Sequence, residues 1–228
     1  MTPLSQSAEK FSPRGLILDM DGLMVDSEPL WFRVERAFAT ARGGDWNEER
    51  AHACTGRGTP HTLRTMSELF GFPVDVARDT REIMDTFLAR LDELHLKPGL
   101  LELLAEAEGA LPIAVASSSP MRLIQGVLDR FALTGRVNAI VSGDAVRSSK
   151  PAPDIFLAAA REIHVAPERC AVLEDSLAGA TAGRAAGMFV IAVPERRADG
   201  FERVADRVVA DLFAARRALV LPERCREA

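Results

Sequence analysis

The run GLILDMDG, residues 15–22, constrains the fold more than any other stretch of the chain. A short apolar segment, Leu16 to Asp19, leads into two carboxylates one residue apart, and Gly22 follows at once. Short apolar runs bounded by turn residues indicate buried strands. In open α/β sheets, ligands bind where such strands end. We therefore expect a strand that delivers Asp19 and Asp21 to the ligand-binding edge of a sheet.

Further apolar runs of the same kind predict the remaining strands. Segments of helical period lie between the later runs, including Pro120 to Phe131, which Ser119 and Pro120 should begin as N-cap and first-turn proline. This alternation predicts an α/β fold with a parallel, doubly wound sheet. The expected strands after the first are Ile113 to Ser117, Ala139 to Ser142, Cys170 to Glu174, Met188 to Val193 and Val208 to Val209.

About ninety residues separate the first two expected strands, where a simple crossover needs a few tens at most. Apolar residues in this interval recur at helical spacing. One interpretation is a helical excursion that only adds core. The other is a helical cap domain at 30–96, inserted into a core formed by 1–29 and 97–228, with hinges near Glu28–Pro29 and Lys97–Gly99. The apolar positions are Leu30, Val34, Phe38 and Ala41, then Leu63, Met66 and Phe70, then Ile83, Phe87, Leu91 and Leu94.

Composition narrows the classes of partner. The chain has no run of 18 apolar residues, which argues against a membrane span. Its formal charge of -5 argues against a nucleic-acid partner. Three widely spaced cysteines, Cys54, Cys170 and Cys225, and a polar N-terminal segment MTPLSQSAEKF without an apolar stretch favour reduced thiols and no secretory signal. We therefore expect a cytoplasmic protein, and we expect a monomer.

The strand ends carry an acidic cluster. Asp19, Asp21, Glu174 and Asp175 would place up to four negative charges in one crevice, which disfavours their joint ionisation. Such a cluster requires a cation. Oxygen ligands without a histidine or cysteine set suit Mg²⁺ better than zinc. A single strand-end aspartate is more often a turn former or helix cap, so the prediction depends on the cluster.

The spacing of Asp19 and Asp21 allows a division of labour. Side chains alternate along an extended segment, so these two carboxylates share a face. One of them could attack as a nucleophile while the other transfers protons. A carboxylate that attacks a phosphoryl group forms an aspartyl phosphate, and positive charge must neutralise the phosphate oxygens. Lys150, in the run SKPAPD, is the candidate cation, although such a lysine by itself is more often a solvated surface residue.

Four ordered runs carry a resemblance to a known family. The runs DMDGLMVDSEP, IAVASSS, SKPAPDIF and VLEDSLAGATAGRAAG are similar to the four motifs of the haloacid dehalogenase superfamily. They resemble most the branch that holds β-phosphoglucomutase and the sugar-phosphate phosphatases. The resemblance covers nearly the whole chain and implies a Rossmann-like core with a mobile helical cap. It implies a Mg²⁺-dependent phosphatase that acts on a small phosphorylated metabolite, with a sugar or sugar-alcohol phosphate as the best guess.

The resemblance also implies roles for individual residues. Asp19 is expected to be the nucleophile, Asp21 the general acid and base, Ser117 a ligand of the phosphate oxygens, and Lys150 the cation beside nucleophile and phosphate. The Mg²⁺ ion is expected on Asp19, the backbone carbonyl of Asp21, Asp175 and, directly or through water, Glu174. Ser118 and Arg57 are the candidate substrate contacts, and Arg57 could equally be a solvated loop residue.

Three alternatives stay open at this point. Dehalogenases of the family lack the second aspartate, so Asp21 argues against dehalogenation. A β-phosphoglucomutase would return the phosphoryl group to the sugar, but mutases of this branch carry a histidine where this chain has Trp31. A phospho-aspartate signalling module uses similar residues, but such domains are about half this length and have no helical insert.

Overall fold

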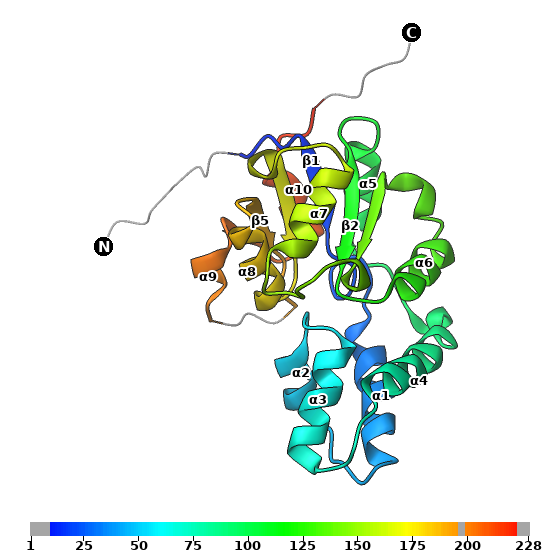
Figure 1. Cartoon of the computed structure of the whole chain (residues 1–228). Helices are drawn as coiled ribbons and strands as arrows, with labels where there is room; N and C mark the ends of the chain where they lie inside the picture. Colours follow the sequence, from blue (N-terminus) through cyan, green and yellow to red (C-terminus); the bar gives the residue numbers. More distant parts are fainter. Residues whose placement is uncertain (1–9, 196–198, 223–228) are drawn as a thin grey trace.

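The computed structural model describes residues 10–195 and 199–222, and a parallel sheet forms its centre (Figure 1). The sheet has six strands in the order β3-β2-β1-β4-β5-β6, and all neighbouring pairs are parallel. The prediction of a doubly wound α/β sheet is confirmed. The strands are β1 (Gly15–Leu18), β2 (Ile113–Ser117), β3 (Ala139–Ser142), β4 (Cys170–Glu174), β5 (Phe189–Ala192) and β6 (Arg207–Val208).

Helices cover both faces of this sheet, because both faces of its central strands are apolar. Ile17 packs with residues of α7 (Asp154–Glu162) and α8 (Leu177–Ala185) on one face. Leu16 and Leu18 belong to the larger core on the other face. That face is covered by α5 (Leu100–Ala107), α6 (Met121–Arg130) and α10 (Leu212–Arg217). The structure also contains the short helix α9 (Phe201–Val204). Four 3₁₀ turns lie at Leu91–Glu93, Thr134–Arg136, Gly143–Ala145 and Pro167–Arg169.

Four of the helices between β1 and β2, those that precede α5, form a helical unit that lies beyond the carboxyl ends of the strands (Figure 1). Side chains cap two of them: Asn47 accepts a hydrogen bond from Arg50 N, and Asp75 accepts one from Arg78 N. The predicted apolar positions are buried with few exceptions, of which Ala41 is exposed because its helix ends one residue earlier. The helices are α1 (Glu28–Thr40), α2 (Glu48–Cys54), α3 (Thr59–Phe70) and α4 (Val76–Leu88).

Two linkers connect this helical unit to the sheet, and they run side by side. Val25 forms an antiparallel bridge with Leu96, flanked by hydrogen bonds from Asp26 N to the His95 carbonyl and from Lys97 N to the Met24 carbonyl, each 2.9 Å long. The ammonium of Lys97 lies 3.4 Å from Asp26 Oδ1 and 2.9 Å from Glu195 Oε2. The pairing means that one linker cannot swing without the other. The boundaries 30–96 for an independent cap stay a prediction.

Two of the three cysteines lie among the described residues. Cys54 and Cys170 are buried free thiols. Cys225 and residues 1–9, which include most of the polar N-terminal segment, lie outside the described residues. Within residues 10–195 and 199–222, no helix combines the length and the apolar character that a membrane crossing requires.

Candidate active site

The carboxyl ends of the strands converge on one buried ion-pair network. Asp19 follows β1, Glu174 ends β4, and Lys150 comes from the loop after β3. The Lys150 ammonium lies 2.5 Å from Asp19 Oδ1, and it also donates to Glu174 Oε1. All three side chains are buried. Residues from three parts of the chain thus meet because parallel strands end at the same edge of the sheet.

Lys150 is held in its charged form by these partners. Its side chain is 2% exposed and its ammonium lies 5.0 Å from the centre of the Phe156 ring. Burial by itself lowers the pKa of Lys150, but the carboxylates of Asp19 and Glu174 more than offset this, so that the pKa lies above its ordinary value. The solvated surface lysine considered from the sequence is therefore excluded.

The acidic cluster has more negative charge than Lys150 balances. Carboxylate oxygens of Asp19, Glu174 and Asp175 all lie within 4.8 Å of one another, and all three residues are buried. Burial first, and then the neighbouring carboxylates, raise the pKa values of Asp19 and Asp175 well above their ordinary range, which Lys150 opposes. Three carboxyl groups thus face one ammonium. The donor set, oxygen only and short of positive charge, fits a hard divalent cation.

The hydrogen bonds within this cluster show which carboxylate oxygens already have donors. Glu174 Oε1 accepts from Lys150, and its Oε2 accepts from Ser176 N at 3.0 Å and Ser176 Oγ at 2.9 Å. Both oxygens of Glu174 therefore already have donors. Gly22 leaves the space beside Asp175 open, since a Cβ there would collide with Asp175 Oδ2, and its φ of +79° also favours glycine.

Asp21 has different surroundings from those of Asp19. Its Oδ1 accepts from the Ser27 hydroxyl at 2.9 Å and from the Trp31 indole N–H at 2.8 Å. Its Oδ2 accepts from the Ser119 hydroxyl at 2.8 Å and more weakly from Ser117 at 3.3 Å. Neutral donors from both the sheet and α1 therefore orient this carboxylate, and no ammonium or guanidinium of the described residues pairs with it.

Sequence reasoning missed these partners of Asp21. The prediction that Ser119 caps the following helix is wrong: Pro120 occupies the N-cap position without a side-chain bond, and the Ser119 hydroxyl is taken by Asp21. The spacing of Ser117 and Ser119 could have revealed this, since alternate residues of an extended segment face the same side. The contacts of Ser27 and Trp31 depend on how α1 sits on the sheet, and no local pattern contains that information.

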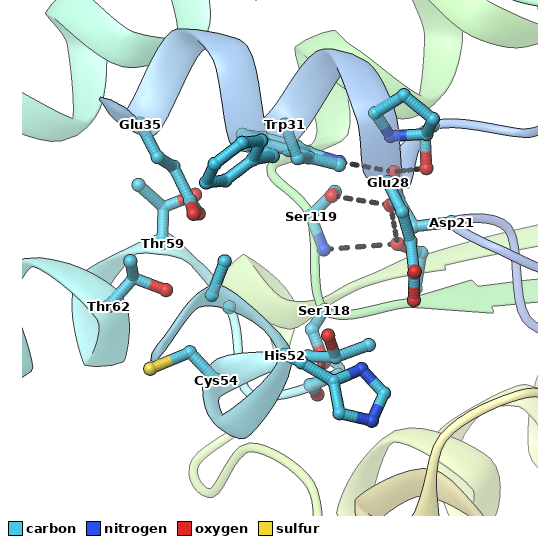
Figure 2. Close-up of a pocket in the computed structure, with 18 of the residues that line it drawn as sticks. Asp21, Glu28, Trp31, Glu35, His52, Cys54, Thr59, Thr62, Ser118 and Ser119 are labelled. Carbon is cyan, nitrogen blue, oxygen red and sulfur yellow. Dashed lines mark hydrogen bonds between the residues drawn. The ribbon is translucent and has the colours of Figure 1, made fainter. Parts of the chain in front are cut away.

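A cavity of about 390 Å³ opens between the sheet edge and the helical unit (Figure 2). Asp19, Asp21 and the segment 117–119 contribute to its sheet side, and residues of α1, α2, α3 and the loop between α2 and α3 contribute most of the rest of its lining. Its size lies in the range of small-molecule sites. Three of the four predicted catalytic residues, Asp19, Asp21 and Ser117, thus line one cavity of a size that suits a small metabolite, and Lys150 lies behind Asp19.

The two candidate substrate contacts have different positions. Ser118 lines the cavity, and its hydroxyl donates to the Gly56 carbonyl at 3.0 Å, which joins the sheet edge to the loop between α2 and α3. Arg57, in that loop, is exposed and lines a neighbouring depression together with Asp175 and Ser176. The structure therefore brings Ser118 to the cavity but leaves Arg57 on its outer side.

Comparisons with known proteins agree with this geometry. A family model described as haloacid dehalogenase-like hydrolase matches residues 13–187. Hexitol phosphatase B of Escherichia coli K12 is 32% identical over 205 residues, 82% of this chain and 86% of the relative. A bifunctional riboflavin kinase/FMN phosphatase of Arabidopsis thaliana is 31% identical over 193 residues, 84% of this chain, which spans about half (51%) of that relative. The crystal structure of CbbY from Rhodobacter sphaeroides in complex with phosphate superposes with a TM-score of 0.79 at 30% identity, covering 88% of this chain and 95% of CbbY.

Proposed function

Since the chain belongs to the haloacid dehalogenase-like hydrolases and is a phosphoric monoester hydrolase, we propose that it cleaves a sugar or sugar-alcohol phosphate through an aspartyl phosphate. The proposal rests on one observation above all. Two carboxylates two residues apart have opposite surroundings: Asp19 contacts a buried ammonium, whereas Asp21 contacts only neutral donors and faces the cavity. The first is suited to attack, and the second to exchange a proton with a leaving group.

The reaction proceeds in two displacements. In the first, Asp19 attacks phosphorus, the bond to the ester oxygen breaks, and Asp21 gives its proton to the leaving alkoxide. In the second, Asp21 takes a proton from water, the resulting hydroxide attacks the aspartyl phosphate, and inorganic phosphate leaves with Asp19 restored. The hydrogen bonds from Ser27, Trp31 and Ser119 keep the Asp21 carboxyl aimed at the cavity during both steps.

Positive charge near Asp19 is a requirement of this chemistry. Lys150 supplies one cation beside Asp19, and the proposal assigns it and the Ser117 hydroxyl, which lines the cavity, to the phosphate oxygens. We assign Asp19, the Asp21 carbonyl and Asp175 as ligands of Mg²⁺, and Glu174 as a ligand through water because its oxygens already have donors. When bound, Mg²⁺ supplies the charge that screens the attacking carboxylate from the phosphoryl oxygens.

The mutase alternative has less support. A mutase of this type must hold a bisphosphate and let it turn around, so its cavity needs cations at both ends. Among the described residues that line this cavity, the one lysine or arginine is Arg33, and its guanidinium donates to Glu93 at 2.6 Å. Where mutases of this branch carry a histidine, this chain has Trp31, and its indole N–H donates a hydrogen bond to Asp21.

A panel of metabolite phosphates tests the proposal. It should include hexitol and hexose phosphates, β-glucose 1-phosphate and glucose 1,6-bisphosphate, with phosphate release and isomerisation measured in parallel. We expect Mg²⁺-dependent phosphate release from hexitol or hexose phosphates. Isomerisation to glucose 6-phosphate that outruns phosphate release would establish a mutase instead. We further propose that the protein acts as a monomer in the cytoplasm, in keeping with the buried free thiols Cys54 and Cys170.

A further inference from the structure

A buried carboxyl group that the reaction does not use lies in the same cavity. Glu35, on α1, lines the cavity although only 8% of its surface is exposed. Figure 2 shows Glu35 beside Thr59 and Thr62 at one end, Asp21 at the other end, and Trp31 between them. A carboxyl group with so little exposure needs an explanation, because burial of this group is costly unless partners compensate.

The partners of Glu35 satisfy only half of the group. Its Oε2 accepts a hydrogen bond from the indole N–H of Trp46 at 2.9 Å, and Trp46 is itself buried in the helical unit. Its Oε1 has no hydrogen-bond partner among the described residues, and no lysine or arginine pairs with it there. Because Oε1 lacks such a partner and yet is not a fully buried atom, it opens into the cavity. Trp46 thus fixes the carboxyl while the second oxygen stays available to a ligand in the cavity.

The neighbouring threonines extend this polar end. Thr59 and Thr62, at the start of α3, are 7% and 3% exposed and line the cavity. The Thr59 hydroxyl makes no hydrogen bond to another residue in the part of the chain that the structure describes. Hydroxyl groups both donate and accept, so a carboxyl beside them is suited to the hydroxyls of a neutral ligand. A second phosphate at this end would meet a carboxyl and no cation.

The helix sets the distance between the two ends. Trp31, which binds Asp21, and Glu35 are four residues apart on α1 and therefore lie on the same side of the helix. This separation is about 6 Å along the helix axis. An extended chain advances about 1.2 Å per bond, so about five bonds, from the leaving oxygen through four carbons to a distal hydroxyl, are needed to span this separation.

We propose that Glu35 determines substrate specificity by binding a distal hydroxyl of the leaving group, which selects polyhydroxylated monophosphates of four or more carbons. Thr59 contributes a second polar contact at the same end. This inference rests on the proposed phosphatase function and names the feature of the substrate that the helical unit reads. It assigns Glu35 no part in the transfer of the phosphoryl group itself.

The test compares three substrates with the full-length protein and Mg²⁺. Sorbitol 6-phosphate reaches the Glu35 end, glycerol 3-phosphate is too short, and p-nitrophenyl phosphate has no hydroxyl there. Glu35→Met removes both oxygens at similar length, and we expect it to lower kcat/KM for sorbitol 6-phosphate about 10-fold to 100-fold, as for loss of a hydrogen bond to a charged group. The values for the other two substrates should change by less than about 3-fold, which is below 1 kcal/mol.

Two further variants keep the test decisive. Glu35→Gln retains an acceptor for Trp46 and is expected to fold, and it should cause a smaller selective loss with sorbitol 6-phosphate. Glu49→Gln, on the exposed side of α2, removes the same charge outside the cavity and should leave all three values unchanged.

Equal losses on all three substrates with both Glu35 variants would overturn the specificity role in favour of a structural one, as would no loss on any of them. Absence of hydrolysis of every substrate by the wild-type protein would instead overturn the proposed phosphatase function. The two failures are therefore distinguishable.

Discussion

The two ends of the cavity are built in different ways. At the sheet end, Asp19, Glu174 and Lys150 come from three separate strands or loops, and their side chains form a compact network of paired charges. At the helical end, Glu35 has a single neutral donor, Trp46, and one free oxygen. Under our two proposals, the sheet end binds the charged phosphoryl group and a cation, and the helical end binds uncharged hydroxyls. Chemistry and recognition would then lie in different layers of the molecule.

The largest expected effect is at the sheet end. Asp19→Asn should lower phosphate release by roughly 10⁴-fold or more, because the amide cannot act as the nucleophile. Lys150 keeps Glu174 as a partner, so the variant should fold. Steady-state phosphate release with sorbitol 6-phosphate measures the effect, and Asp92→Asn, on the exposed surface of the helical unit, is the matched control. Turnover within tenfold of wild type would show that Asp19 is not the nucleophile.

Removal of divalent metal should also act at the sheet end alone. EDTA should abolish phosphate release and Mg²⁺ should restore it, because Lys150 alone does not balance three carboxyls. Mg²⁺ should also raise the Tm of the wild-type protein, since a ligand of the folded state stabilises it. Asp175→Asn should raise the Mg²⁺ concentration for half-maximal activity at least about 10-fold. Full activity after exhaustive chelation would contradict the assigned metal site.

The helical end should make stability depend on pH. Burial raises the pKa of Glu35 from an ordinary 4.5 to about 7, opposed only by the hydrogen bond from Trp46. The folded state therefore holds this proton more tightly than the unfolded state. The stabilisation that this proton gives to the folded state is fully present below pH 4.5, decreases as the pH rises, and is lost above pH 7. The Cys54 thiol, which interacts with Glu35, stays protonated because burial first, and the Glu35 charge after it, raise its pKa.

A comparison of variants isolates this contribution. The free energy of unfolding of Glu35→Gln relative to wild type should rise by about 3 kcal/mol between pH 4.5 and pH 8, since one pKa unit corresponds to about 1.4 kcal/mol. Urea unfolding of both proteins at matched pH values measures the difference, in which all other titrating groups cancel. A difference that does not vary with pH would mean that the pKa of Glu35 is the same in the folded and the unfolded protein.

The smallest expected effect concerns the contact that joins the two ends. Trp31→Phe should keep the ring packed against Phe87, whose centre lies 4.2 Å away, while removing the hydrogen bond to Asp21. We expect kcat/KM for sorbitol 6-phosphate, which covers only the steps up to departure of the leaving group, to fall about 3-fold to 10-fold, the effect of one hydrogen bond. p-Nitrophenyl phosphate, whose leaving group needs little protonation, should be nearly unaffected. An equal loss on both substrates would show that the indole does not act through Asp21.

The sequence predicted the sheet with good accuracy. The predicted bounds of β2, β3 and β4 agree with the structure, because strands buried on both faces are continuous apolar runs between turn residues. The pairing of Asp19 with Lys150 also follows from the fold, since strand ends in a parallel sheet meet at one edge. The sequence did not predict the antiparallel bridge between Val25 and Leu96, because it joins residues far apart in the chain.

The sequence by itself determined which chemistry this protein carries, since each carboxylate and the lysine of the sheet end is placed by a local strand or loop. Only the tertiary structure decided which helical residues face that chemistry. Glu35 enters the cavity and Trp31 reaches Asp21 because α1 packs against α2 and α4 in one orientation. That orientation depends on contacts between distant segments, which the spacing of residues along a single helix does not encode.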